Sequence, residues 1–350
     1  MTARKAVRDP FFDYYSQFFT EYLPSTKDSS PNTIASYRSA FRLIEDYYVN
    51  STGRPFATMT MATLSVAFVE GFMGWLKDAR NSSPATVGVR LAAVRSFLWF
   101  CTSRDALYTA LCNAVASIPT PSVPDRGLVY LSHEALKAIF AQPDPDRTKG
   151  LRDLTFMVLM YESAARMQEM LSLRICDIRT DDGILCLWLT GKGRKRRVIP
   201  LGVKASRHLA RYLETFHKGA GINSDALLFY TVIHGQRCSM SADCADLFIK
   251  KYAAAARVYC VDVPQKMHSH LFRHSRAMHL YQAGNDLITV RDFLGHTSIA
   301  TTDIYARADT KMLADAISKV SPSGEHKDKD WEDAEIAGQI KDYLRLHGFV

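Results

Sequence analysis

Six side chains between residues 166 and 305 of this 350-residue sequence have types that suit chemistry on an anionic group. They are two arginines, one lysine, two histidines and one tyrosine: Arg166, Lys192, His270, Arg273, His296 and Tyr305. Together they offer one nucleophile, two fixed positive charges, and two or three groups able to carry a proton. That set suits the attack of a side chain on a phosphodiester without a metal ion.

The two arginines suit the phosphate itself. A phosphodiester resists attack because it is already anionic and its leaving alkoxide is poor, so the non-bridging oxygens need positive charge. A guanidinium stays charged at any working pH and can bind two oxygens at once. The simpler interpretation of Arg166 is an ion pair with Glu169, three residues further along a helix. The two interpretations are compatible, because such a carboxylate would hold the guanidinium in place.

The motifs around these residues resemble those of the tyrosine recombinases, also called the phage-integrase family. Residues 165–173 (Ala-Arg-Met-Gln-Glu-Met-Leu-Ser-Leu) resemble the family's first arginine box, and residues 191–201 resemble its catalytic-lysine hairpin. Residues 270–273, 294–296 and Tyr305 resemble its second box in order and spacing. The resemblance therefore covers the chain from Leu151 to Arg307.

One departure from the family precedes the first arginine. The family usually has Thr-Gly-Leu there, whereas this chain has Ser163-Ala164-Ala165. We expect the change to affect packing and to touch no charged group, so activity should survive it.

The resemblance implies a role for each residue of the set. Tyr305 would be the nucleophile, and Lys192 the general acid that protonates the departing 5′ oxygen, provided that nearby cations lower its pKa. His270 would contact the phosphate and could accept the tyrosine proton. His296 would donate a hydrogen bond to a non-bridging oxygen. Glu169 stands where family members carry an acidic residue that positions the arginine.

Simpler interpretations stand beside these roles. Tyr305 could be an ordinary half-buried tyrosine, and the basic hairpin could be a solvated turn that binds phosphates without specificity. We keep the second interpretation for three of the hairpin's residues, Arg194, Lys195 and Arg196. The spacing of His270 and His274 also occurs in helical metal sites, but Arg273 between them would repel a cation. We expect His268, His274 and His279 to be structural.

The composition places the chain among globular proteins of two domains. Hydrophobic residues make up 47% and charged residues 23%, and the net charge of +8 with a pI of about 9.0 favours a polyanionic partner. Seven cysteines, without a C-x-x-C pair, indicate reduced core residues of a cytoplasmic protein: Cys101, Cys112, Cys176, Cys186, Cys238, Cys244 and Cys260. No apolar run reaches the roughly 20 residues of a membrane span, and no signal peptide is expected.

Residues 1–118 predict an all-helical domain. Ser30-Pro31 and Ser83-Pro84 are two copies of a helix start, a serine N-cap followed by proline, and apolar residues recur at helical spacing after each. The region resembles the core-binding domain of the same family, a helical bundle that grips DNA. Four arginines face away from the apolar stripes and are expected to contact phosphates, although a solvated face is the simpler alternative: Arg38, Arg42, Arg90 and Arg95.

Prolines at 119, 121 and 124 mark a linker over residues 119–130. Residues 131–320 predict the catalytic domain, with helices and one β-hairpin made of Ile184–Thr190 and Arg197–Leu201. The last segment, 321–350, predicts a polar stretch and an amphipathic tail that, by resemblance to the family, docks on a neighbouring protomer. The expected fold is mainly α with a small β-sheet: an N-terminal helical-bundle core-binding domain plus an α+β catalytic domain.

We expect a site-specific DNA recombinase that cleaves and rejoins strands through a 3′-phosphotyrosine intermediate and a Holliday junction, without a cofactor. The resemblance implies a homo-tetramer on two sites in double-stranded DNA, with room for accessory DNA-bending proteins. A narrower resemblance, to integrases of transposons and integrative elements, suggests integration or excision of a mobile element. Two alternatives are a type IB topoisomerase, which nicks and reseals one duplex, and a DNA-binding accessory protein with an inactive site.

Overall fold

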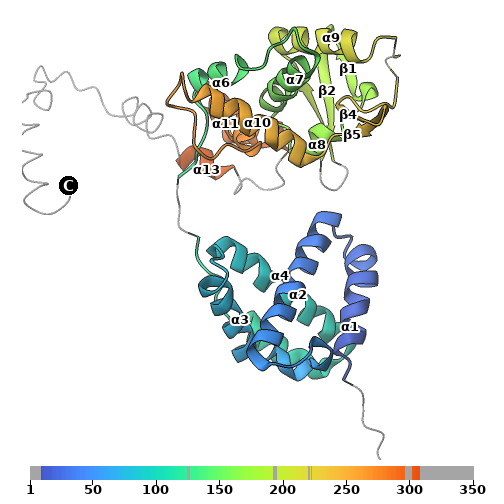
Figure 1. The fold of residues 1–350 in the computed structure, drawn as a ribbon, viewed down its shortest axis with the longest axis vertical. Helices are drawn as coiled ribbons and strands as arrows, with labels where there is room; N and C mark the ends of the chain where they lie inside the picture. Colours follow the sequence, from blue (N-terminus) through green and yellow to red (C-terminus); the bar gives the residue numbers. More distant parts are fainter. Residues whose placement is uncertain are drawn as a thin grey trace, which may run out of the picture. The chain divides into compact units, whose positions relative to one another are not determined.

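The computed structural model describes residues 9–123, 127–191, 195–219, 221, 223–295 and 302–307. The chain divides into two compact units, Met1–Arg126 and Gly127–Val350 (Figure 1). Each unit has its own hydrophobic core. No helix among the described residues is long and apolar enough to cross a membrane.

The described part of unit 1 is helical, as the sequence predicts. Its elements are α1 (Phe11–Gln17), η1 (Phe18–Thr26), α2 (Pro31–Thr52), η2 (Phe56–Thr58), η3 (Met61–Leu64), α3 (Val66–Asp78), α4 (Pro84–Arg104), η4 (Ala106–Tyr108) and α5 (Thr109–Ala116). Here η1 is a π-helical segment and the other η elements are 3₁₀ turns.

The two predicted helix starts are confirmed. The hydroxyl of Ser30 accepts a hydrogen bond from the backbone N–H of Thr33 at 3.2 Å, and Ser83 does the same for Thr86 at 3.2 Å. Each bond satisfies an N–H that the first helical turn leaves unpaired. These caps explain why α2 and α4 begin at the prolines that follow them.

An aromatic core holds unit 1 together. Phe97 of α4 meets Phe18 of η1 and Phe41 of α2 edge to face, with ring centroids 5.4 and 5.2 Å apart. Edge-to-face pairs of this kind stabilise beyond their buried area. The apolar stripes that the sequence predicts on α2 and α4 supply much of this core.

Unit 2 combines helices with two small sheets. Its elements are α6 (His133–Phe140), α7 (Thr148–Ser163), α8 (Met167–Leu171), η5 (Ile175–Asp177), β1 (Ile178–Asp181), β2 (Ile184–Thr190), β3 (Arg196–Pro200), α9 (Val203–Phe216), β4 (Tyr230–Ile233), β5 (Gln236–Ser239), α10 (Ala242–Ala256), α11 (His270–Gln282), α12 (Leu287–Leu294) and α13 (Asp303–Arg307).

The predicted hairpin is the centre of the larger sheet. Strand β2 pairs antiparallel with β3, with Leu187 opposite Ile199, and β1 adds to its other edge. Leu187, Leu189 and Ile199 are buried in the core of the unit. The short strands β1, β4 and β5 were not predicted.

Helix α11 positions much of the candidate site. It packs against α7 on one side and against α12 and α13 on others. A small second cluster of buried apolar residues lies where these helices meet: Ala164, Ala277, Met278, Val290, Leu294 and Tyr305. The helix expected around Leu313 to Val320 and the tail beyond it lie outside the described residues.

Candidate active site

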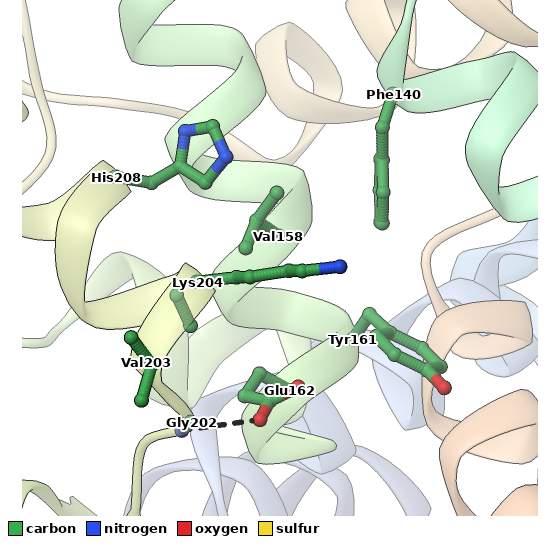
Figure 2. Close-up of a pocket in the computed structure, with 9 residues that line it drawn as sticks. Phe140, Val158, Tyr161, Glu162, Gly202, Val203, Lys204 and His208 are labelled. Carbon is green, nitrogen blue, oxygen red and sulfur yellow. Dashed lines mark hydrogen bonds between the residues drawn. The ribbon is translucent and has the colours of Figure 1, made fainter.

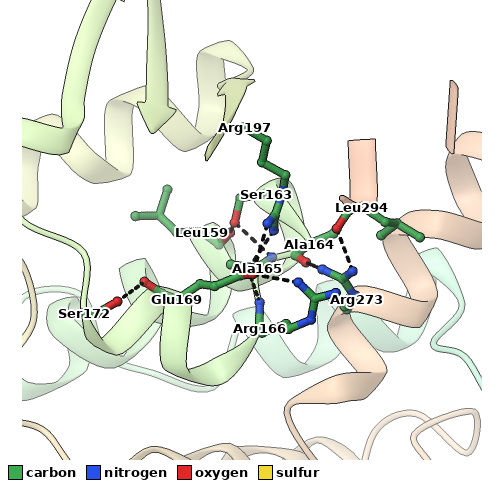
Figure 3. Close-up of polar contacts among 10 residues, drawn as sticks. All are labelled: Leu159, Ser163, Ala164, Ala165, Arg166, Glu169, Ser172, Arg197, Arg273 and Leu294. Atoms are coloured by element: carbon green, nitrogen blue, oxygen red, sulfur yellow. Dashed lines mark hydrogen bonds and ion pairs between the residues drawn. The ribbon is translucent and has the colours of Figure 1, made fainter. Parts of the chain in front are cut away.

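The first arginine lies where α7 ends and α8 begins. Arg166 is the N-cap residue of α8, and its backbone N–H donates to Glu169 Oε2 at 2.8 Å. Its guanidinium donates from Nη1 to Glu169 Oε1, also at 2.8 Å (Figure 3). The side chain is 35% exposed, whereas that of Glu169 is 5% exposed. The predicted ion pair therefore holds Arg166 in place while leaving it open to an incoming anion.

A second arginine binds the same carboxylate from the sheet. Arg197 of β3 donates from Nη1 to Oε1 at 3.0 Å and from Nη2 to Oε2 at 2.7 Å (Figure 3). Burial alone would raise the pKa of Glu169, but the hydrogen bonds and charges of Arg197, together with Arg166, prevail and lower it to about 2. Glu169 is thus ionised at any working pH and joins α8 to β3.

Two glycines lie against this cluster. A β-carbon on Gly191 would come within 3.1 Å of Glu169 Oε1, and one on Gly295 within 3.2 Å of Arg197 Cδ. Gly295 has a left-handed φ of 65°, which favours glycine further. Lys192 and His296 follow these glycines directly in the sequence. Both residues, and Arg194, lie outside the described residues.

The second phosphate-clamp candidate, Arg273, is 4% exposed. Its Nη1 donates to the carbonyl of Ala164 at 2.6 Å and its Nη2 to that of Leu294 at 2.7 Å (Figure 3). Burial, and then the charges of Arg166 and Arg197, lower its pKa from the ordinary value of 12.5. The positive charges of Arg166, Arg197 and Arg273 therefore repel one another, and a bound anion would reduce this repulsion.

Within the segment Ser163-Ala164-Ala165, the backbone of Ala164 contacts the second arginine. Its carbonyl accepts a hydrogen bond from Arg273. It also has a φ of 47°, in the left-handed region, where the family usually has glycine. A non-glycine residue in that region costs about 1 kcal/mol. The contact uses the backbone, so either residue type can make it.

His270 opens α11 and is exposed. Desolvation, and then the neighbouring charges of His268, Arg273 and Arg166, lower its pKa. Its ring centroid lies 6.4 Å from that of His274. An exposed imidazole beside two arginines suits contact with a phosphate.

Tyr305 lies on α13 and is 1% exposed, within the apolar cluster between the helices. Burial raises the pKa of its phenol, and the charge of Arg273 partly opposes that rise. The hydroxyl lies 3.1 Å from Nδ1 of His274. The sequence, from which we expected His274 to be structural, does not reveal this contact. The one signal in the sequence that could have pointed to His274 is its position one helical turn after His270.

The DNA-contact candidates of unit 1 fall into two groups. Arg38 and Arg42 are exposed on α2, and Arg38 lies 5.4 Å from the ring of Phe19. Arg90 donates to the carbonyl of Ser36 at 2.8 Å and so ties α4 to α2.

Arg95 donates to the carbonyls of Val115 at 3.4 Å and Ala116 at 3.1 Å, and also to that of Ile118. These bonds satisfy the C-terminal end of α5 and hold the Arg95 guanidinium in place within unit 1. In unit 2, Lys195 and Arg196 are exposed on the hairpin.

A separate pocket of about 360 Å³ lies between α6, α7 and α9 (Figure 2). Phe140, Val158 and Val203 give it apolar walls, and Glu162 at its edge accepts a hydrogen bond from the N–H of Gly202 at 3.2 Å. None of the described catalytic candidates lines it.

Comparison with known proteins identifies the family. Residues 129–312, more than half of the chain, match the model of the phage integrase family. Residues 17–105 match the phage integrase N-terminal SAM-like domain. The chain belongs to the phage integrase family. Its members are the tyrosine recombinases, so the match agrees with the resemblance of the two boxes.

Individual relatives agree with this assignment. The tyrosine recombinase XerD of Xanthomonas axonopodis pv. citri (strain 306) is 30% identical over 260 residues, which cover 72% of this chain and 81% of the relative. The XerH site-specific recombinase bound to its difH substrate, after cleavage, has a similar fold, with a TM-score of 0.65 and 19% identity over 89% of each chain. The Tn1549 transposon integrase in complex with transposon right-end DNA also has a similar fold, with a TM-score of 0.62 and 14% sequence identity. The match covers 87% of this chain and 98% of that chain.

Proposed function

We propose that this member of the family is a site-specific DNA recombinase whose nucleophile is Tyr305. One observation supports it above all: Arg273 donates to the carbonyl of Ala164, two residues before Arg166, and Ala164 and Tyr305 belong to one buried cluster in unit 2. Tyr305 would attack a phosphodiester, form a 3′-phosphotyrosine bond and release a 5′-hydroxyl. The 5′-hydroxyl of a second strand would then attack that bond.

The remaining residues have roles in the same step. Arg166 and Arg273 neutralise the non-bridging oxygens, and loss of one such preorganised donor typically costs on the order of 3–4 kcal/mol of transition-state stabilisation. Glu169 holds Arg166 in place. His270 contacts the phosphate, His296 donates to a non-bridging oxygen, and Lys192 protonates the departing 5′ oxygen.

The reaction keeps the bond energy in the phosphotyrosine, so no nucleotide or other cofactor is needed. We further propose that four copies assemble on two double-stranded DNA sites in the cytoplasm, with or without accessory DNA-bending proteins. The proposed contacts to DNA phosphates are Arg38, Arg42, Arg90 and Arg95 of unit 1, and Arg194, Lys195 and Arg196 of the hairpin. The fold shared with a transposon integrase is compatible with a mobile element as substrate.

Covalent capture tests the nucleophile. The parent should form a protein–DNA adduct stable to denaturation, Tyr305→Phe should bind DNA as well without forming it, and Tyr281→Phe, a partly buried tyrosine packed beside the same cluster, should behave as the parent. An adduct in Tyr305→Phe would show that another residue is the nucleophile. Relaxation of supercoiled DNA by a monomer, without strand exchange between two duplexes, would favour a type IB topoisomerase.

A further inference from the structure

The Tyr305 hydroxyl has a specific partner inside the protein. It lies 3.1 Å from Nδ1 of His274, one helical turn after His270 on α11. The ring centroids of His274 and Tyr305 are 6.1 Å apart and the planes are tilted by 54°, so the contact is a hydrogen bond and not a stack.

The charge state of His274 makes it an acceptor. Burial, and then the charges of His270, His268 and Arg273, lower its pKa to about 4. The imidazole is therefore neutral near pH 7, and a neutral ring has one nitrogen that donates and one that accepts. A protonated phenol beside Nδ1 donates to it, which puts the imidazole proton on Nε2.

We propose that His274 is a catalytic residue, the general base that takes the proton of Tyr305 as the phenol attacks DNA. The proposal rests on Tyr305 being the nucleophile. In the step, the proton moves from the hydroxyl to Nδ1 of His274, the phenol oxygen forms a bond to phosphorus, and the bond from phosphorus to the 5′ oxygen breaks. The 5′ oxygen leaves with a proton from Lys192. In rejoining, the attacking 5′-hydroxyl gives its proton to Lys192 and its oxygen bonds to phosphorus. The bond from phosphorus to the Tyr305 oxygen breaks, and the proton on His274 returns to that oxygen.

In the free protein, the pKa shifts of both partners favour a protonated phenol. Burial raises the pKa of the phenol while the pKa of His274 is held near 4, so the proton remains on Tyr305. Burial is the largest cause of the lowered pKa of His274, and the fixed charge that adds to it near pH 7 is that of Arg273, which Arg166 in turn affects. A bound phosphodiester would offset this positive charge and raise the pKa of His274, so base catalysis begins when the substrate is in place.

This assignment moves one role away from His270. The resemblance to the family allows His270 to accept the tyrosine proton, but the imidazole within hydrogen-bond distance of the Tyr305 hydroxyl is that of His274. His270 is exposed and remains a contact for the phosphate. Sequence spacing alone cannot separate the two histidines, because both lie on one face of α11.

The test compares two histidines on one helix. His274→Asn keeps an acceptor oxygen near the position of Nδ1 but removes the base. His279→Asn is the matched control, since His279 Nδ1 forms a similar contact, 2.9 Å, with the hydroxyl of Tyr161, and its pKa is also lowered to about 4. The single-turnover rate of adduct formation is measured on a nicked substrate from pH 5 to 9, with DNA affinity and thermal unfolding as checks of folding.

His274→Asn should lower the rate at neutral pH by about 10²–10⁴-fold, the usual contribution of general base catalysis. Its rate should rise with pH across the range, whereas the parent and His279→Asn should level off once the imidazole is neutral. An unchanged rate, or a lower rate with the parent's pH profile, would overturn the proposal.

A second measurement does not depend on how well the variant packs. A fluorinated tyrosine at position 305, whose phenol ionises near neutral pH, should recover activity in His274→Asn because no base is then required. Lack of recovery would also overturn the assignment. The tests of the base and of the nucleophile can fail separately. An adduct in Tyr305→Phe would contradict the proposed function. Formation of the Tyr305 adduct at the same rate with and without His274 would contradict this inference alone.

Discussion

Arg273 and Tyr305, on which the proposed chemistry most depends, are both buried in the free protein. Two nitrogens of Arg273 already donate to carbonyls, and the hydroxyl of Tyr305 already has a partner. A guanidinium carries five N–H groups, so Arg273 keeps donors for a phosphate even with two in use. The carbonyl contacts therefore fix its orientation without exhausting it.

The proposed role of Lys192 as general acid can be tested by changing the single bond that breaks. If it protonates the departing oxygen, Lys192→Ala should lose activity on ordinary DNA and recover it on DNA whose bridging 5′ oxygen is replaced by sulfur, a leaving group that needs no proton. Lys195→Ala, in the same hairpin, should lower DNA affinity modestly and show no such recovery. Adduct formation on both substrates measures this, and a Lys192→Ala variant equally inactive on both would indicate a binding role.

At the scale of elements, one carboxylate connects the start of the helix that Arg166 caps to the second strand of the lysine hairpin. Glu169 binds Arg166 of α8 and Arg197 of β3, and Gly191 and Gly295 lie against the cluster. Gly191 and Gly295, which directly precede Lys192 and His296 in the sequence, therefore both lie beside the ion pairs of Glu169. Arg197 is a positioning residue by this geometry, since it acts on Arg166 through Glu169.

Breaking this connection should destabilise unit 2. Arg197→Gln removes one partner of a buried ion pair, which typically costs about 3–5 kcal/mol. Arg196→Gln, at the exposed neighbouring position of β3, should change stability by less than about 0.5 kcal/mol. Hydrogen exchange of the β2 and β3 amides in the full chain measures the local free energy of opening.

The stability difference between the parent and Arg197→Gln should depend on pH through the carboxylate of Glu169. Its pKa in the folded state is lowered from 4.5 to about 2, so the stability it contributes is present above pH 4.5 and is lost as the pH falls towards 2. The gap between the parent and Arg197→Gln should shrink over the same range. A gap that does not change with pH would mean that Arg197 stabilises by packing alone.

At the scale of the whole molecule, the tail is expected to couple protomers. Residues 331–350 predict an amphipathic segment whose apolar positions, Ile336, Ile340 and Tyr343, need a surface to cover them. Truncation after Val320 should leave single-protomer DNA binding intact and abolish cooperative assembly and recombination. The double substitution Ile336→Ala and Ile340→Ala should reproduce this loss, whereas Lys341→Ala should not.

Gel-shift titration and a two-site recombination assay separate the outcomes. Normal assembly by the truncated protein would show that the tail is dispensable. Loss of single-protomer binding would show instead that the tail completes the core of its own domain.

Much of the fold follows from local sequence signals. The serine caps, the apolar spacing of α2 and α4 and the alternation of β2 act within a few residues of one another, so they can be recognised without a structure. The strands β1, β4 and β5 are four residues each and mostly exposed, so their sequences show little alternation. Their pairing depends on neighbours that the sequence does not place.

The sequence by itself determined which side chains are available for chemistry, because a tyrosine, arginines and histidines suit attack on a phosphodiester and their order and spacing resemble those of the family. The tertiary structure decided which of them meet. Arg197 reaches Glu169 across 28 residues and His274 reaches Tyr305 across 31. Contacts of that range depend on how α8, β3, α11 and α13 pack, and residue spacing carries no record of packing between elements. For that reason the sequence alone does not distinguish His274 as a candidate base, whereas the packing of α13 against α11 brings it to the Tyr305 hydroxyl.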